Sequence, residues 1–306
     1  MNIRFFKLRL MVATAILLQL GVTKAIAEDK GKVDWEALNP DIKGATFVKS
    51  STECVECHEE YIRTYAMSKM GRTLPDGGCE SCHGPMSKHL DAPRKKPALV
   101  VSLSENSRLT AAQKTAICTQ CHQSGLQINW QTSPHAGADN TCTGCHNIMS
   151  VEDPVRNKLT QTKVCFTCHT DKRAKMYRFS RHPVKEGKVV CSDCHNPHGG
   201  PGSNLAKNTV NETCYQCHAE KRGPHLWEHQ PVRESCTVCH DPHGSTTPRM
   251  LVQKLPFLCQ NCHSTGHAAG LITGAGPASR TFGRACITCH SQIHGSNHPS
   301  GAVLTR

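Results

Sequence analysis

Every cysteine in the chain belongs to a Cys-x-x-Cys-His motif. There are 20 cysteines, and they form ten such motifs with none left over. We number the motifs 1 to 10 in chain order, and they begin at Cys54, Cys79, Cys118, Cys142, Cys165, Cys191, Cys214, Cys236, Cys259 and Cys286. Paired cysteines at this spacing can form a disulfide, one half of a zinc site or the attachment point of a c-type haem.

The histidine that follows the second cysteine separates these three interpretations. Disulfides and zinc ribbons do not need it, whereas a haem held by two thioethers takes that side chain as the proximal ligand of its iron. The second cysteines are Cys57, Cys82, Cys121, Cys145, Cys168, Cys194, Cys217, Cys239, Cys262 and Cys289. The proximal histidines are His58, His83, His122, His146, His169, His195, His218, His240, His263 and His290. The sequence therefore predicts ten covalently bound c-type haems (haem c).

A haem iron with one protein ligand has an open face that can bind substrate, whereas an iron held on both faces passes electrons only. The chain has 20 histidines, so ten remain for the second face. We expect the distal ligands among His89, His135, His182, His198, His225, His229, His243, His267, His294 and His298, with Met70 as a further candidate. The match between ten irons and ten remaining histidines favours ligation of the whole set, although a single one could be a surface histidine.

The motifs group into five repeats of two motifs each, numbered 1 to 5 here. A middle histidine often precedes the second motif of a repeat, as do His135, His182 and His229. A trailing histidine often follows it, as do His198, His243 and His294, with His89 further out in repeat 1. The trailing histidines are too close to their own proximal histidine to reach the other face of the same haem. We therefore expect them to bind a neighbouring iron, which the spacing does not identify.

The repeat pattern has gaps and extra residues. Met70 stands where repeat 1 would have its middle histidine, and repeat 2 has no trailing histidine after His146. His225 and His298 are extra, and His267 is out of register. Either the extra histidines fill the gaps from a distance, or Met70 binds one iron and raises that haem's potential. The other interpretation of Met70 is a packing contact of its thioether against a porphyrin.

The elements that position these motifs have little apolar material of their own. Aromatic residues make up 5% of the chain, and Gly and Pro number 23 and 17. A chain of 306 residues normally buries a continuous side-chain core. We therefore expect the haems to form the interior, with short α-helices and loops around them and little or no β-sheet. One such helix should begin near Ala111, with Ser107 or Thr110 as its N-cap.

The first residues are typical of a secretory signal peptide. Arg4, Lys7 and Arg9 precede a short apolar stretch at 10–22, and Ala25-Ile26-Ala27 forms a cleavage signal. We expect residues 1–27 to be removed on export, with an uncleaved anchor as the alternative.

The net charge of +12 does not indicate a nucleic-acid partner. Removal of residues 1–27 takes away four basic residues and leaves +8. Ten ferric haems with ionised propionates would contribute about −10 by charge counting. The basic residues are therefore predicted to pair with propionates, and the densest run lies at 171–178, which could equally be a solvated helix face.

The layout resembles the periplasmic decahaem c-type cytochromes of the MtrA/DmsE type, which include MtrA, MtoA and PioA-like proteins. The resemblance rests on the ten motifs, the signal peptide, the segments 194–199 and 239–244, and the ending at 286–299. It implies an elongated array of two five-haem modules, for which we expect a segment at 28–50, an N-terminal module at 51–170 and a C-terminal module at 171–306. Met70 departs from an all-histidine ligand set and leaves that one ligand open.

The resemblance also implies partners and a location. Members of this type sit in an outer-membrane β-barrel porin, meet an extracellular multihaem cytochrome and exchange electrons with periplasmic or inner-membrane cytochromes. Others serve a respiratory reductase. The leading hypothesis is a non-catalytic electron conduit across the outer membrane for extracellular electron transfer. A diffusible periplasmic shuttle and a multihaem reductase enzyme are the alternatives, and the enzyme is disfavoured because all ten motifs end in histidine.

Overall fold

The computed structural model describes residues 33–48, 52–75, 78–200, 204–263 and 284–305. The expected signal peptide at 1–27 and His267 lie outside these ranges. The chain divides into two compact units. The N-terminal unit comprises residues up to Gly125 together with 139–144, and the C-terminal unit comprises 126–138 and the residues from Cys145 onward. These units do not test the expected five-haem modules at 51–170 and 171–306, because the modules are defined by how the haems group. The modules therefore stay a prediction.

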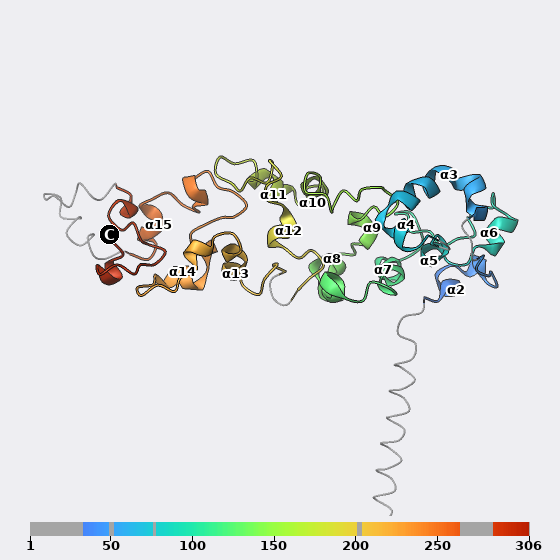
Figure 1. Ribbon diagram of the computed structural model, residues 1–306, viewed down its shortest axis with the longest axis horizontal. Coiled ribbons are helices and arrows are strands. Elements are labelled where there is room, and N and C mark those ends of the chain that lie inside the picture. The colour runs from blue at the N-terminus through green and yellow to red at the C-terminus, as the bar shows by residue number, and fades with distance from the viewer. Residues whose placement is uncertain (1–32, 49–51, 76–77, 201–203, 264–283, 306) are drawn as a thin grey trace, which may run out of the picture. The chain divides into compact units, whose positions relative to one another are not determined.

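Short helices and loops make up both units, as Figure 1 shows. The N-terminal unit contains α2 (Trp35–Leu38), η1 (Pro40–Ile42), α3 (Thr52–Met67), α4 (Lys69–Thr73), α5 (Glu80–His83), α6 (Ser87–Asp91) and α7 (Ala111–Thr119). Helix α9 (Cys142–Cys145) and the 3-10 segment η2 (Gly125–Thr132) each cross the boundary between the units. The predicted helix near Ala111 is confirmed as α7, whose N-cap is Thr110 in a capping box with Gln113.

The C-terminal unit repeats the same kind of short element. Its helices are α8 (Pro134–Gly137), α10 (Gln161–Cys165), α11 (Thr170–Lys175), α12 (Cys191–Cys194), α13 (Val210–Tyr215), α14 (Gln230–Glu234) and α15 (Phe257–Gln260). Its 3-10 turns are η3 (Ala219–Lys221), η4 (Cys236–Val238), η5 (Pro248–Met250), η7 (Cys286–Thr288) and η8 (Gly301–Val303). The described residues contain no β-strand, only isolated bridges such as Ser180 with Ser245 and Trp227 with Ser296.

A small side-chain core exists in the N-terminal unit, which the composition did not predict. Ile42, Leu99, Val101 and Ile117 are buried against one another, with Trp35 and other partly buried residues around them. This cluster fixes the segment that follows motif 2, because Val101 donates its backbone N–H to the carbonyl of His83.

The C-terminal unit instead leaves large apolar side chains at its surface. Leu159, Phe179 and Leu226 are each more than 70% exposed. Exposed apolar side chains of this size can pack against a partner, a ligand or a cofactor. Their exposure fits a unit whose interior is completed by porphyrins and not by side chains alone.

None of the helices in the described ranges is both long enough and apolar enough to cross a membrane.

Candidate haem-binding sites

None of the twenty cysteines forms a disulfide. Most motifs lie on one helical turn, which places their two cysteines on neighbouring positions of the same face. Helices α9 and α12 each begin at the first cysteine of a motif and end at the second. In the part of the chain that the structure describes, no three His, Cys, Asp or Glu side chains are close enough together to hold a metal ion. The thiols are thus available in pairs, as attachment to the two vinyl groups of a haem requires.

The first cysteines of the two motifs within each repeat form hydrogen bonds with each other. The five pairs are Cys54–Cys79, Cys118–Cys142, Cys165–Cys191, Cys214–Cys236 and Cys259–Cys286. At Cys118, the hydrogen bond to Cys142 and then burial raise the thiol pKa. At Cys214, burial and then the neighbouring Cys236 raise the thiol pKa to about 12. The thiols of Cys118 and Cys214 therefore stay protonated near neutral pH, whereas the hydrogen bond with Cys165 lowers the pKa of the Cys191 thiol to about 7. As thioethers of a bound haem these groups would not titrate.

Consecutive repeats also approach one another through cysteines. The pairs are Cys82–Cys121, Cys145–Cys165, Cys194–Cys217 and Cys239–Cys262. In each pair the charge of one thiol adds to larger effects, such as burial, that raise the pKa of the other thiol. Together with the pairs inside the repeats, they join motif 1 to motif 2 and so on to motif 10. Within each unit, the haem attachment points therefore follow one another in chain order.

Seven proximal histidines face a second histidine ring. The pairs and their centroid separations are His58–His89 (6.3 Å), His135–His169 (5.9 Å), His146–His198 (5.9 Å), His182–His218 (6.3 Å), His195–His243 (5.9 Å), His229–His263 (6.1 Å) and His240–His294 (6.3 Å). Two metal–nitrogen bonds of about 2 Å, plus the distance from each nitrogen to its ring centre, separate two axial imidazoles by about 6 Å. These rings are therefore spaced to hold one iron between them.

Two rules describe six of the seven pairs. The middle histidine of a repeat faces the proximal histidine of the first motif in the next repeat, as His135 faces His169. The trailing histidine faces the proximal histidine of the second motif in the preceding repeat, as His198 faces His146. The trailing histidines thus lie opposite the proximal histidine of a motif two places earlier in the chain. That they bind the iron of a neighbouring haem stays a prediction. His89 is the exception, because it faces His58 within its own repeat.

Hydrogen bonds to the backbone link the middle histidine of one repeat to the trailing histidine of the next. His135 Nδ1 donates to the carbonyl of Pro197 at 2.8 Å, and His182 Nδ1 donates to that of Pro242 at 2.9 Å. Each acceptor directly precedes a trailing histidine. A ring that donates through Nδ1 keeps the Nε2 lone pair for a metal. The middle histidine therefore holds the trailing turn of the next repeat through its Nδ1.

The trailing turns have a common geometry. The backbone N–H of Gly199 donates to the carbonyl of Asn196, and that of Gly244 donates to Asp241, both at 3.1 Å. The side chain of the first residue also accepts the backbone N–H of the histidine, as Asp241 Oδ1 does for His243 at 3.1 Å. Such turns are favoured by Asn or Asp at the first position. The short Asn-Pro-His-Gly and Asp-Pro-His-Gly segments are therefore turns that present one imidazole each.

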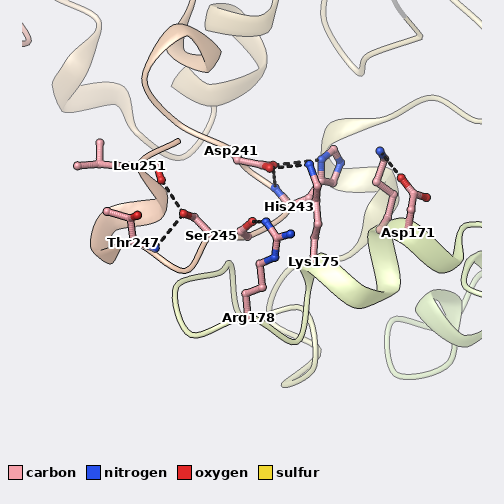
Figure 2. Close-up of polar contacts among 10 residues, drawn as sticks. Asp171, Lys175, Arg178, Asp241, His243, Ser245, Thr247 and Leu251 are labelled. Carbon is pink, nitrogen blue, oxygen red and sulfur yellow. Dashed lines mark hydrogen bonds and ion pairs between the residues drawn. The ribbon is translucent and has the colours of Figure 1, made fainter. Parts of the chain in front are cut away.

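Figure 2 shows how one of these turns is anchored to the helix before it. Lys175, at the end of α11, forms an ion pair with Asp241 Oδ2 at 2.7 Å, while Oδ1 of the same carboxylate lies 3.7 Å from His243 Nδ1. Arg178 donates to the carbonyl of Gly244. Lys172 also forms an ion pair with Asp171, at 2.7 Å, so three of the basic residues in the run at 171–178 are paired with the protein in this structure.

Burial keeps several paired imidazoles neutral. It lowers the pKa of His89, His195, His198, His229, His243 and His294. The neutral form is the one that binds a metal. In addition, Nδ1 of His89 and of His198 is buried without a hydrogen-bond partner among the described residues. Proton binding at these rings is unfavourable, which suits iron ligands.

The remaining candidates differ from the seven pairs. Among the proximal histidines, His83, His122 and His290 are the three that do not belong to a ring pair in the described ranges. His225 has its Nε2 buried without a hydrogen-bond partner in the described ranges. His298 Nδ1 accepts the backbone N–H of Ser300 at 3.2 Å, so the neutral ring carries its proton on Nε2. Ligation by these residues, as by the paired histidines, stays a prediction.

Two features of the sites were not predicted from the sequence. Trp130 packs its ring 6.2 Å from that of His198 and is 8% exposed. Met149 occupies the third position of a turn closed by Ser150 N–H and the Asn147 carbonyl at 3.3 Å, the position that His198 has in its own turn. The signal for Met149 was its place three residues after a proximal histidine.

The chain matches three family models, each over part of its length. The doubled CXXCH motif matches residues 182–223 and 229–268. The NrfB-like c-type cytochromes match residues 79–161, and cytochrome c554 and c-prime match residues 23–84. The multiheme cytochrome MtrA of Shewanella baltica (strain OS185) is 42% identical over 275 residues, which cover 84% of this chain and 82% of that protein. The chain therefore belongs to the MtrA family of multihaem c-type cytochromes, which bind c-type haems and transfer electrons.

Proposed function

We propose that this cytochrome carries electrons across the outer membrane from within a β-barrel porin. Its partners would be periplasmic or inner-membrane cytochromes on one side and an extracellular multihaem cytochrome or metal on the other. The identity of 42% to MtrA over most of both chains supports this assignment. The same row of haems serves outward metal reduction and inward oxidation of ferrous iron.

The observation that carries the proposal is the succession of neighbouring cysteine pairs from one motif to the next within each unit. Bound haem supplies one-electron exchange between ferric and ferrous iron. The chain's own residues supply the order: each cysteine pair fixes one haem next to its neighbour along the sequence. An electron that enters at one end of such a row would then meet each attachment point in turn.

The paired histidines support a conducting role and not a catalytic one. Rings at 5.9–6.3 Å would hold an iron from both faces at seven of the ten motifs and leave no position for substrate there. All ten motifs end in histidine, whereas multihaem reductases often replace one of these by lysine. We therefore propose that the chain is not an enzyme.

A porin lumen also suits the chemistry of the chain. Interiors of outer-membrane barrels are polar. Charged residues make up 20% of this chain, so its surface can pack within such a lumen without an apolar span of its own. We place the mature chain in the periplasm, inserted in a barrel complex.

A liposome assay tests this route. The tagged cytochrome is purified in detergent from its host with whatever remains bound, and the complex is inserted into liposomes that enclose a reduced viologen dye. We expect a stoichiometric β-barrel protein and oxidation of the dye by ferric citrate added outside. The double variant Cys191→Ala, Cys194→Ala loses motif 6, so it should retain the barrel, carry nine haems and transfer electrons at least tenfold more slowly.

Two outcomes would overturn the route. Recovery of the cytochrome in the periplasmic fraction without a barrel would favour the diffusible shuttle. Undiminished transfer by the variant without motif 6 would show that the row of haems is not the path.

A further inference from the structure

The ligand pattern breaks at the first repeat, where Met70 takes the place of a middle histidine. In repeats 2, 3 and 4 that position holds His135, His182 and His229, and each of them faces the first motif of the next repeat. The corresponding partner of Met70 is His122, the proximal histidine of motif 3. His122 faces no second histidine ring in the ranges that the structure describes.

The local backbone presents Met70 as it presents His135. Helices α4 and α8 each begin after a buried serine, Ser68 or Ser133, with 2% and 3% exposure. The serine side chain accepts the backbone N–H three residues later, at 3.0 Å from Gly71 and 3.1 Å from Ala136. Met70 and His135 are both the second residue of the helix that follows. One capped turn therefore carries a thioether in repeat 1 and an imidazole in repeat 2.

The motifs that follow these two turns are joined in the same way. His135 precedes motif 4, which approaches motif 5 through Cys145 and Cys165, and His135 faces the proximal histidine of motif 5. Met70 precedes motif 2, which approaches motif 3 through Cys82 and Cys121. A hydrogen bond of 2.9 Å from Gln120 Nε2 to the carbonyl of Ser81 connects motifs 2 and 3 again. The motifs that follow Met70 are thus joined like those that follow His135.

We propose that Met70 Sδ is the axial ligand opposite His122 on the haem of motif 3. Methionine is the other side chain that commonly completes a c-type haem, and it raises the reduction potential relative to two histidines. The side chain has three rotatable bonds, so it can reach an iron from the position that an imidazole takes in the other repeats. Motif 3 then carries a haem with a higher potential than its neighbours.

The assignment depends on the haem content of the chain and not on its route through a membrane. It is tested on the purified mature holoprotein in solution. Failure of the Met70 assignment would leave the proposed function standing, and failure of the proposed function would leave the Met70 assignment standing. Variants Met70→Leu and Met70→His are compared with Met67→Leu, a matched control at the end of α3 whose side chain is 47% exposed. Haem number is measured for each as the pyridine haemochrome.

The first readout is the near-infrared magnetic circular dichroism of the oxidised protein, where methionine–ferric and bis-histidine haems have separate charge-transfer bands. We expect a methionine band in the parent protein and in Met67→Leu. Met70→Leu should lose an intensity that corresponds to one haem and gain one high-spin haem. Met70→His should lose the same intensity without a high-spin signal, and one haem should titrate at a lower potential.

The proposal is overturned if the parent protein lacks the methionine band, or if Met70→His keeps it in full. Because Met70→His supplies the ligand of the other repeats, it tests the assignment even if Met70→Leu fails to mature. A Met67→Leu protein that loses the band would equally contradict the assignment.

Discussion

Asp153 accepts a hydrogen bond from Nδ1 of His146, with 2.5 Å between the carboxylate oxygen and the ring nitrogen. The carboxylate is held in place by the backbone N–H groups of Asn147 and Val155. In His83, His240 and His290 the corresponding acceptor is a backbone carbonyl. A carboxylate makes the imidazole more basic than a carbonyl does. As the proximal ligand of motif 4, His146 would thus be a stronger electron donor to a bound iron.

Replacement of Asp153 should therefore raise the potential of one haem. In Asp153→Asn the carboxylate is lost while the side-chain shape is kept. We therefore expect one haem in the low-potential part of the reductive titration to be reduced at a higher potential. Potentiometric titration with optical detection measures this. Glu152→Gln is the control, because Glu152 bonds Asn157 and not a ring. An unchanged titration curve in Asp153→Asn would show that the contact does not tune this haem.

The angle between paired imidazoles predicts two classes of magnetic resonance signal. The rings of His146 and His198 lie at 10° to each other, whereas those of His135 and His169 lie at 72°. The angle between two axial imidazole planes sets the splitting of the iron d orbitals. We expect rhombic low-spin signals from the near-parallel pairs and a strongly anisotropic low-spin signal from the pair at 72°. Electron paramagnetic resonance of His135→Met should lack the anisotropic signal. Its persistence in that variant would contradict the pairing.

Gly244 is predicted to be indispensable in its turn. Its φ is +129°, and a Cβ added there would lie 2.3 Å from the backbone oxygen of Lys175. Gly244→Ala should lower the free energy of unfolding by about 1–3 kcal/mol through backbone strain and displacement of α11. Gly200→Ala is the matched control, since its nearest contact would be 3.7 Å away. Urea titrations followed by far-ultraviolet circular dichroism compare the two, and equal stabilities would refute the close approach.

The ion pair of Lys175 and Asp241 predicts a pH-dependent contribution to stability. Burial raises the pKa of Asp241, but the hydrogen bond and charge of Lys175 outweigh it, so the pKa is lowered in the folded state. A lowered folded pKa contributes stability above the unfolded value of about 3.9, and this is lost as the pH falls through the folded pKa. Both side chains are partly exposed, so the contribution should be at most about 1 kcal/mol.

Lys175→Met tests this contribution. Its unfolding free energy should fall below that of the parent protein at neutral pH, and the difference should disappear in acid once Asp241 is protonated. Lys172→Met, which removes only an exposed partner of Asp171, should show no such difference. A difference that persists unchanged at acidic pH would contradict the role of Asp241.

The sequence predicted the haem chemistry well and the pairing of ligands only in part. The Cys-x-x-Cys-His motif is local, so its ten copies and the cap at Thr110 could be identified from neighbouring residues. The partner of each trailing histidine could not, because His198 meets His146 across a distance that only the packed repeats define. The core around Ile42 was missed for the same reason, since its residues come from segments far apart in the chain.

The central claim, that the irons are held from both faces so that the row only conducts, is tested most directly by electron paramagnetic resonance of the fully oxidised, purified chain. Haem content is measured on the same sample by the pyridine haemochrome and by intact mass. We predict ten haems per chain and low-spin signals that account for all of them. A high-spin signal equal to one haem or more in the parent protein would contradict the claim and indicate an iron open to substrate.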